Sequence, residues 1–117
     1  DGKFIAFTSD ASGKYEVWLY NIETRIKSRL TFTRGNSGSP DFSPDGKKII
    51  FLNEVDNKQD IYIINTDGSE LTQLTNTPDI NELTCVFSPK GNEILSSYTP
   101  VNSDNVEINL LLLGRKD

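Results

Sequence analysis

Apolar residues along the chain occur in short runs of four to six, rich in Ile, Val, Phe and Tyr, and polar turn residues separate the runs. Runs of this length and composition are typical of β-strands. No window shows the 3.6-residue periodicity of an amphipathic helix. The pattern therefore predicts an all-β protein with strands at 4–9, 15–21, 26–31, 39–43, 48–53, 60–65, 71–75, 83–87, 93–98 and 106–113.

The sequence repeats itself with a period of 44 to 45 residues. Equivalent positions are marked by Gly2, Gly46 and Gly91. The agreement extends well beyond the glycines, since Ile5-Ala6-Phe7 corresponds to Ile49-Ile50-Phe51, Glu16 to Asn21 corresponds to Asp60 to Asn65, and Leu30-Thr31 corresponds to Leu74-Thr75. Self-similarity at a fixed period of this size indicates one supersecondary unit per repeat.

Each repeat contains up to four strands joined by turn signals such as Asp45-Gly46, because glycine supplies the positive φ that a tight hairpin requires. Four short antiparallel strands per repeat are typical of a β-propeller blade. We therefore predict a partial propeller of about two and a half to three four-stranded antiparallel blades. It forms a single domain over 1–117, with blade one at 1–38, blade two at 39–82 and blade three at 83–117.

Three motifs of the second repeat resemble the TolB-like β-propeller repeat (WD40-like TolB propeller repeats). They are Ser-Pro-Asp-Gly-Lys-x-Ile-x-Phe at 43–51, Asp-Ile-Tyr-x-x-Asn-x-Asp-Gly at 60–68, and Leu74-Thr75. The third repeat departs from the pattern, with Lys90 in place of the aspartate and Ser96 in place of the phenylalanine.

The resemblance implies a non-catalytic protein–protein interaction module, a propeller scaffold of the bacterial cell envelope in a periplasmic or extracytoplasmic location. The alternative is the gating propeller of a larger hydrolase similar to prolyl oligopeptidase or acylaminoacyl peptidase. A sugar-acid lyase on a related propeller would require metal-binding histidines, and the chain has no His.

The number of repeats is small for this family, whose propellers usually have six or so blades. The chain also starts at Asp1 without a Met, so we expect a segment of a longer protein. The first repeat lacks its inner strand and the last lacks its outer strand, which leaves unpaired edges and apolar faces. We expect self-association through these exposed blade edges.

Charge and hydropathy exclude two classes of partner. The net charge is −5, and no Lys/Arg cluster is present, which argues against nucleic acid and against anionic membrane surfaces. The longest apolar run, Leu110 to Leu113, is far too short to span a bilayer, so no membrane insertion is expected. The resemblance implies a protein or peptide as the partner.

The residue inventory offers little catalytic chemistry. With no His and a single Cys, the chain cannot form a His-based hydrolytic triad, a His/Cys zinc site or an internal disulfide. We predict no catalytic residue, no metal and no cofactor. A paired-carboxylate glycosidase is formally open, although the acidic residues lie mostly in turns and at strand starts.

Two polar segments allow alternative interpretations. "RGNSGSP" at 34–40 is expected to be a flexible loop, with an anion cradle as the alternative. "EVDNKQD" at 54–60 is expected to be a solvated hairpin loop, with calcium as the alternative, although Lys58 falls where an oxygen ligand would be needed.

The cysteine and the aromatic residues are expected to be structural. Cys85 lies in a strand-like run, so burial is expected rather than a reactive thiol. Trp18 and Tyr62 occupy equivalent repeat positions, and Tyr20 lies on the same strand face as Trp18. Packing between blades is expected for these three, with a surface binding platform as the alternative.

In the family arrangement, binding involves the loops at one mouth of the propeller channel. These loops correspond to 10–15, 32–38, 54–59, 76–82 and 99–105. Because they are polar and acidic on balance, a basic or mixed-polarity peptide suits them better than a nucleic acid. The candidate binding residues on this loop face are Arg34, Asn36, Asn76, Asp79, Asn81 and Glu82.

Overall fold

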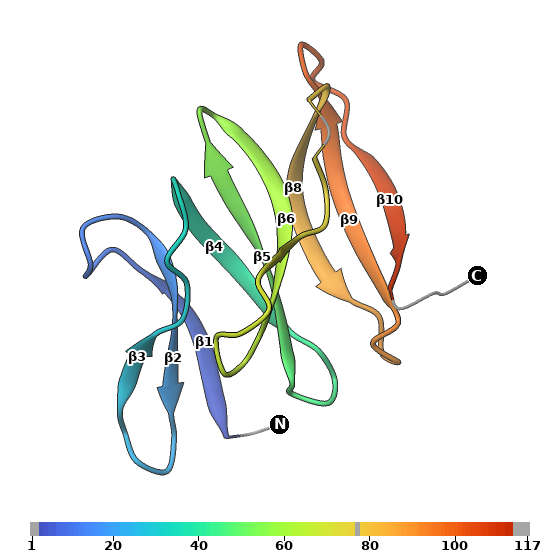
Figure 1. The fold of residues 1–117 in the computed structure, drawn as a ribbon. Helices are drawn as coiled ribbons and strands as arrows, with labels where there is room; N and C mark the ends of the chain where they lie inside the picture. The colour runs from blue at the N-terminus through green and yellow to red at the C-terminus, as the bar shows by residue number, and fades with distance from the viewer. Residues whose placement is uncertain (1–2, 77, 114–117) are drawn as a thin grey trace.

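The computed structural model describes residues 3–76 and 78–113, and within them ten strands form three separate antiparallel sheets (Figure 1). The first sheet contains β1 (Phe4–Ser9), β2 (Glu16–Asn21) and β3 (Lys27–Arg29). The second contains β4 (Asn36–Phe42), β5 (Lys48–Val55), β6 (Lys58–Asn65) and β7 (Thr72–Gln73). The third contains β8 (Ile80–Phe87), β9 (Glu93–Pro100) and β10 (Glu107–Leu112).

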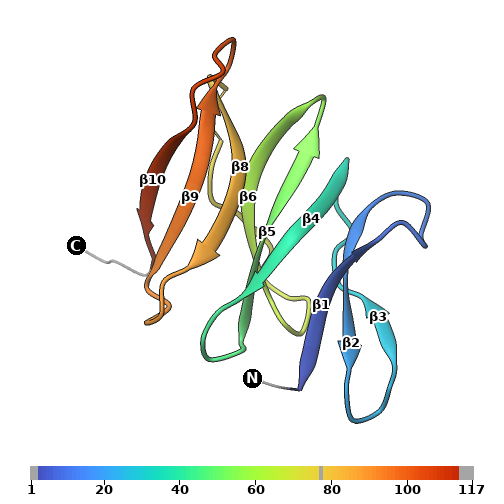
Figure 2. The same ribbon diagram turned by 180° about the vertical axis from the view of Figure 1, so that it is seen from behind.

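The sheets lie side by side, and the view from behind shows the same arrangement (Figure 2). Strand order within the sheets is β1-β2-β3, β4-β5-β6-β7 and β8-β9-β10, so every hydrogen-bonded neighbour is also a neighbour in sequence. The predicted partial propeller, with three, four and three strands, is confirmed. The three sheets are called blades one, two and three below.

Several strand limits differ from the prediction. β4 begins at Asn36 rather than at 39, and β8 begins at Ile80 rather than at 83. Both strands contain a register shift, between Gly38 and Asp41 and between Glu82 and Thr84. A β-bulge interrupts the alternation of side chains, which is why these strand starts carry no clear period-2 pattern. The prediction of a loop at "RGNSGSP" is therefore wrong for residues 36–40.

The β5–β6 connection is also shorter than the predicted loop at 54–59. β5 extends to Val55 and β6 starts at Lys58, so only Asp56 and Asn57 remain in the turn. Both residues have positive φ, 53° and 65°, as a two-residue type I′ hairpin requires. The acidic segment consists of two strand ends and a tight turn.

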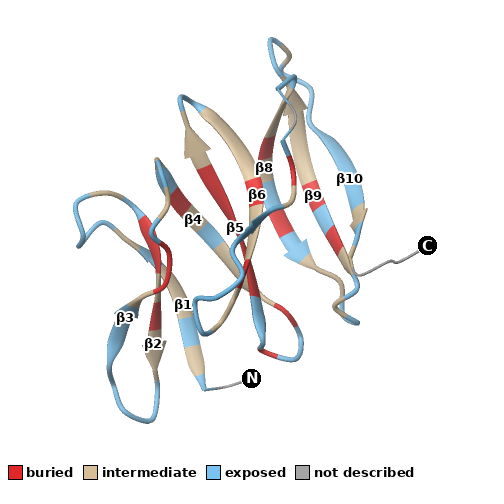
Figure 3. Cartoon of the chain, viewed as in Figure 1, coloured by how far each residue is buried: buried red, intermediate tan, exposed pale blue. Residues whose placement is uncertain are grey.

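Side-chain alternation along β5 provides the core of both joints between blades. Ile49 and Phe51 belong to a buried cluster with Val17 and Leu19 of blade one. Ile50 and Leu52 belong to a second buried cluster, with Cys85 and Ile94 of blade three. Successive residues of a strand point to opposite faces of the sheet, so one strand supports both joints, and buried residues concentrate where the blades meet (Figure 3).

Polar side chains join the blades at repeated positions. Asn36 Oδ1 accepts a hydrogen bond from the Tyr15 backbone N–H at 2.9 Å, and Asn81 Oδ1 accepts one from the Gln59 N–H at 2.8 Å. Asp41 Oδ2 also accepts one from the Phe87 N–H at 2.8 Å. In each case a side-chain oxygen of one blade accepts from a backbone N–H of the neighbouring blade that strand pairing within that blade does not use.

The outer faces of the two end blades are covered by no other described blade. Trp18 and Tyr20 alternate with the buried Val17 and Leu19, so they lie on the outer face of blade one. The prediction that Trp18 and Tyr20 pack between blades is not met within the described chain. On blade three the outer face exposes apolar side chains, namely Val86, Leu95, Ile108, Leu110 and Leu112.

Candidate functional site

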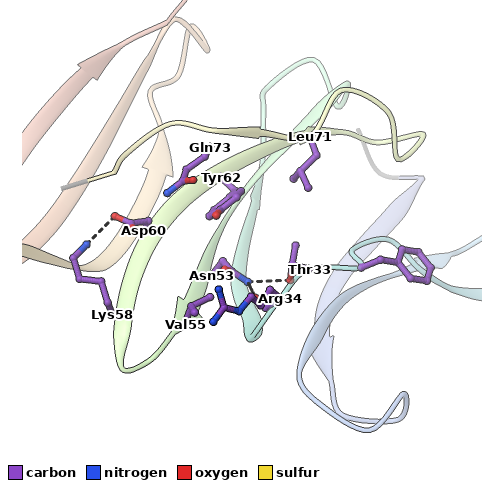
Figure 4. Close-up of a pocket in the computed structure, with 10 residues that line it drawn as sticks. Thr33, Arg34, Asn53, Val55, Lys58, Asp60, Tyr62, Leu71 and Gln73 are labelled. Atoms are coloured by element: carbon purple, nitrogen blue, oxygen red, sulfur yellow. Dashed lines mark hydrogen bonds and ion pairs between the residues drawn. The ribbon is translucent and has the colours of Figure 1, made fainter. Parts of the chain in front are cut away.

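A groove of about 450 Å³ lies where blade one connects to blade two (Figure 4). The segment 30–35 connects β3 to β4, and we call it the first linker. Because this segment forms one wall of the groove, we call the groove the linker groove. Its lining residues are Phe32, Thr33, Arg34, Asn53, Val55, Lys58, Asp60, Tyr62, Leu71 and Gln73. Concave surfaces of this volume that combine apolar and polar groups are the usual location of ligand and peptide sites.

The second wall of the groove is formed by side chains on one face of β5 and β6. Asn53 and Val55 occupy every second position of β5, and they pair with Asp60 and Lys58 of β6. Tyr62 follows on the same face of β6, where it stacks on Phe51 with ring centroids 5.8 Å apart. Burial and the Asp60 charge raise the pKa of Tyr62, so its hydroxyl remains protonated at neutral pH.

Asn53 holds the linker against blade two. Its Nδ2 lies 2.9 Å from Thr33 Oγ1, 2.9 Å from the Arg34 carbonyl oxygen and 3.0 Å from Ser37 Oγ. Gly35 allows the close approach, because a Cβ at this position would lie 2.0 Å from the Glu54 carbonyl oxygen. These hydrogen bonds fix the position of the linker wall of the groove.

The same linker is anchored to blade one by a buried carboxylate. Glu16 is fully buried, and its Oε1 accepts from Thr31 Oγ1 at 2.6 Å and from Thr33 Oγ1 at 3.1 Å. Its Oε2 accepts from Arg29 at 2.9 Å and from Lys14. Burial alone would raise the pKa of Glu16, but hydrogen bonds from Lys14, Thr31 and Arg29 lower it below the ordinary value.

The groove presents both apolar and charged groups to solvent. The Phe32 side chain is 72% exposed, and the Arg29 guanidinium carbon lies 4.2 Å from its ring centroid. Lys58 Nζ and Asp60 Oδ1 form an ion pair at 3.0 Å, whereas Arg34 extends into solvent with Asp56 at 3.8 Å. An exposed surface ion pair of that length contributes little stability, so Arg34 is free to contact a ligand.

Of the six predicted binding residues, Arg34 lines the linker groove, and both Arg34 and Asn36 border a neighbouring hollow of about 280 Å³. Asn36 is the first residue of β4 and not a loop residue, and its side-chain oxygen is occupied by Tyr15. Asn76 and Asp79 are exposed in the second linker, which is the connection between β7 and β8.

Asn81 and Glu82 lie within β8, so their predicted loop position is wrong. Asn81 is occupied by the Gln59 N–H. Glu82 is only 3% exposed, and its Oε1 has no hydrogen-bond partner. Burial, with an added contribution from the Asp60 charge, raises the pKa of Glu82. The structure therefore places Arg34 and Asn36 at the entry into β4, and it places Asn76, Asp79, Asn81 and Glu82 at the entry into β8 or within it.

Sequence reasoning missed the apolar part of the groove. Phe32 and Leu71 are both exposed, at 72% and 46%. The repeat does carry a sequence signal for this apolar surface. The motif Leu-Thr-x-Thr occurs twice, and its variable position is Phe32 in the first repeat and Asn76 in the second. An aromatic residue at the exposed position of an otherwise polar motif indicates a contact surface.

The remaining predictions about chemistry concern Cys85, metals and membranes. Cys85 is buried, as expected, and burial together with Asp41 and Glu82 raises the pKa of its thiol to about 12. In the described part of the chain, no cluster of three or more His, Cys, Asp or Glu side chains could hold a metal ion. Residues 3–76 and 78–113 contain no helix that could cross a membrane.

Comparison with known proteins gives consistent matches. The family model described as the TolB beta propeller domain matches residues 1–102. The Tol-Pal system protein TolB of Anaeromyxobacter dehalogenans (strain 2CP-C) is 36% identical over 81 residues, which cover 69% of this chain and 18% of that protein. The chain thus spans less than a fifth of the length of this relative.

Two solved structures share the fold. A protein assigned as TolB from Agrobacterium tumefaciens superimposes with a TM-score of 0.84 at 22% identity, over 96% of this chain and 42% of that one. TolB from Acinetobacter baumannii gives a TM-score of 0.80 at 24% identity, over 97% of this chain and 28% of that one. At this level of identity the likeness establishes the arrangement of the blades.

Proposed function

Because the chain belongs to the TolB β-propeller family, we propose that it is part of a protein-binding propeller of the bacterial cell envelope, on the periplasmic side. The relative from Anaeromyxobacter dehalogenans carries the name of the Tol-Pal system, and its identity of 36% supports a related role here. We propose that the protein binds its partner without catalysing a reaction on it.

The observation that carries the proposal is the mixed character of the linker groove. Phe32 and Leu71 offer exposed apolar contacts. Arg34, at 82% side-chain exposure, offers a cation that no strong ion pair holds. Protein interfaces combine aromatic and Arg side chains at the centre with polar groups at the rim. A peptide segment of mixed polarity, with an apolar side chain seated between Phe32 and Leu71, fits this groove.

Rigidity of the groove also supports a binding role. The linker wall is held from both sides, by Glu16 of blade one and by Asn53 of blade two. A wall that is already ordered loses little conformational entropy when a peptide binds. The partner would meet a preformed surface.

Site-specific photo-crosslinking in cells tests the proposal. A photoreactive phenylalanine analogue replaces Phe32 in the full-length protein, and a matched variant carries it at Ile22, an exposed position in the β2–β3 connection. We expect one defined protein adduct from position 32 and none from position 22. Arg34→Ala should weaken that adduct. Equal labelling from both positions, or no adduct at position 32, would refute the proposal.

The alternative role as the gating propeller of a serine hydrolase requires a nucleophile outside this segment. A fluorophosphonate probe, which labels activated serines, distinguishes the two when it is added to the full-length protein. We expect no labelling. Stoichiometric labelling that Phe32 variants alter would favour the gating role instead.

A further inference from the structure

A second pocket lies at the opposite end of β5 from the linker groove, between blades two and three, and has a volume of about 460 Å³. Its walls are the side chains of Ile63, Leu74, Phe87 and Leu113. Its charged lining residues are Lys48, Lys90 and Asp45. We call it the Lys48 pocket. The β4–β5 and β8–β9 hairpins border it at the same end of the blades (Figure 1), and a Cβ on Gly91 would lie 3.1 Å from Pro44 Cδ.

The repeat provides an internal reference for this pocket. Lys48 pairs with Asn65 across β5 and β6, as Phe4 pairs with Asn21 across β1 and β2, so the two residues are equivalent. At the first joint Phe4 packs against the buried cluster of blades one and two. At the second joint a lysine takes the place of that ring. The Lys48 pocket is therefore the space that an aromatic side chain occupies one repeat earlier.

The walls of this space are apolar, and they are continuous with the second buried cluster. Ile63, Leu74, Phe87 and Leu113 all pack against the cluster that contains Ile50, Ile61 and Ile94. Apolar walls that solvent can reach favour contact with an apolar group.

The rim adds a positive charge to the apolar interior. Lys48 Nζ donates to the neutral Asn65 Oδ1 at 2.7 Å, and the Asp67 carboxylate interacts with the Lys48 charge at longer range. The nearby carboxylates are hydrogen-bonded within their own turns, Asp45 Oδ1 to Ser43 Oγ and to the Lys47 N–H, and Asp67 Oδ1 to Ser69. Among the described residues, no ion pair within 4.0 Å involves Lys48 or Lys90.

We propose that the Lys48 pocket binds a small amphipathic carboxylate, whose apolar tail fills the space that Phe4 fills at the first joint and whose anionic head lies between Lys48 and Lys90. Lysine ammonium groups beside an apolar wall favour an anion, because a charge-assisted contact is stronger next to a low-dielectric surface than in bulk water. This site is independent of the linker groove and of any protein partner.

Titration of the ¹⁵N-labelled chain with decanoate, below its micelle concentration, tests the proposal. We expect saturable shifts of the Ile63, Leu74, Phe87 and Gly91 amide signals, and an affinity about tenfold above that of decanol, which lacks the charge. Lys48→Phe should abolish the shifts, because the ring fills the pocket as Phe4 does.

Two further variants keep the test decisive if Lys48→Phe does not fold. Lys90→Ala leaves the apolar walls intact and should weaken decanoate binding about tenfold while leaving decanol binding unchanged. Lys47→Ala, an exposed neighbour that does not line the pocket, should change neither. Equal affinity for decanoate and decanol, or shifts confined to Ile108 and Leu110 on the outer face of blade three, would overturn the proposal.

Discussion

Asn53→Ala is the substitution that most directly tests how the two linked blades are held together. The Nδ2 group has two hydrogens and lies within bonding distance of Thr33 Oγ1, Ser37 Oγ and the Arg34 carbonyl oxygen. Without it, the two hydroxyls can still bond to each other, at 2.6 Å. The Arg34 carbonyl, however, would lose the partner that Asn53 supplies.

The expected cost follows from these contacts. Two hydrogen bonds are lost at about 1 kcal/mol each, and one partly buried carbonyl is left unpaired at about 1 kcal/mol or more. The sum is about 3 kcal/mol of unfolding free energy, a large share of the roughly 5–15 kcal/mol that holds a typical domain together. Asn76→Ala, at an exposed position of the second linker, should cost less than about 0.5 kcal/mol.

Urea denaturation followed by far-UV circular dichroism measures both variants. We expect Asn53→Ala to lower the midpoint strongly without a change in slope. Thr33→Val should show a coupling energy with Asn53→Ala of about 1 kcal/mol in a double-mutant cycle. A loss below about 1 kcal/mol for Asn53→Ala, or additivity of the two substitutions, would show that the linker is held by other contacts.

Three further outcomes are expected. The pKa of Glu82 is raised in the folded state, so its contribution to stability falls as pH rises from the unfolded pKa. Glu82→Gln should therefore gain stability relative to the native chain as the pH rises above the unfolded pKa of the carboxyl group, and a pH-independent difference in urea midpoints would contradict this. Cys85, with a pKa near 12, should resist a thiol reagent at pH 8 until urea unfolds the chain; rapid labelling in buffer would place the thiol at the surface. The mass from sedimentation should rise with concentration through the apolar face of blade three, and Leu110→Lys should reduce that rise; an unchanged mass in both would exclude this face.

The blades were predictable because their signals are periodic. Ile49-Ile50-Phe51 and its counterparts appear as a strand, and Asp45-Gly46 and Lys90-Gly91 mark hairpin turns whose glycines have φ of 74° and 80°. Hydrophobic runs and glycine turns are local properties. Three repeats of the same local pattern then determine the stacked architecture.

The candidate site was less predictable because its parts depend on contacts across blades. Asn36 and Asn81 are polar residues in apparent loops, yet their side chains cap backbone groups of the preceding blade. Glu82 looks like a solvated acid, but the bulge beside it places it in the interior. A single sequence does not report which neighbour a polar residue meets, so binding and structural roles look alike until the blades are assembled.

Because β5 contributes residues to both buried clusters, the central blade contributes more to the packing than either of its neighbours. Ile49 and Ile50 are adjacent in sequence and belong to different clusters. A one-residue slip of this strand would exchange the two sets and damage both joints at once. Among the described residues, blade one packs on the central blade through one buried cluster and blade three through the other, whereas melting of the central blade opens both. The amide protons of β5 and β6 should therefore survive longest in deuterated solvent, and the central blade should be the last part of the chain to lose its order.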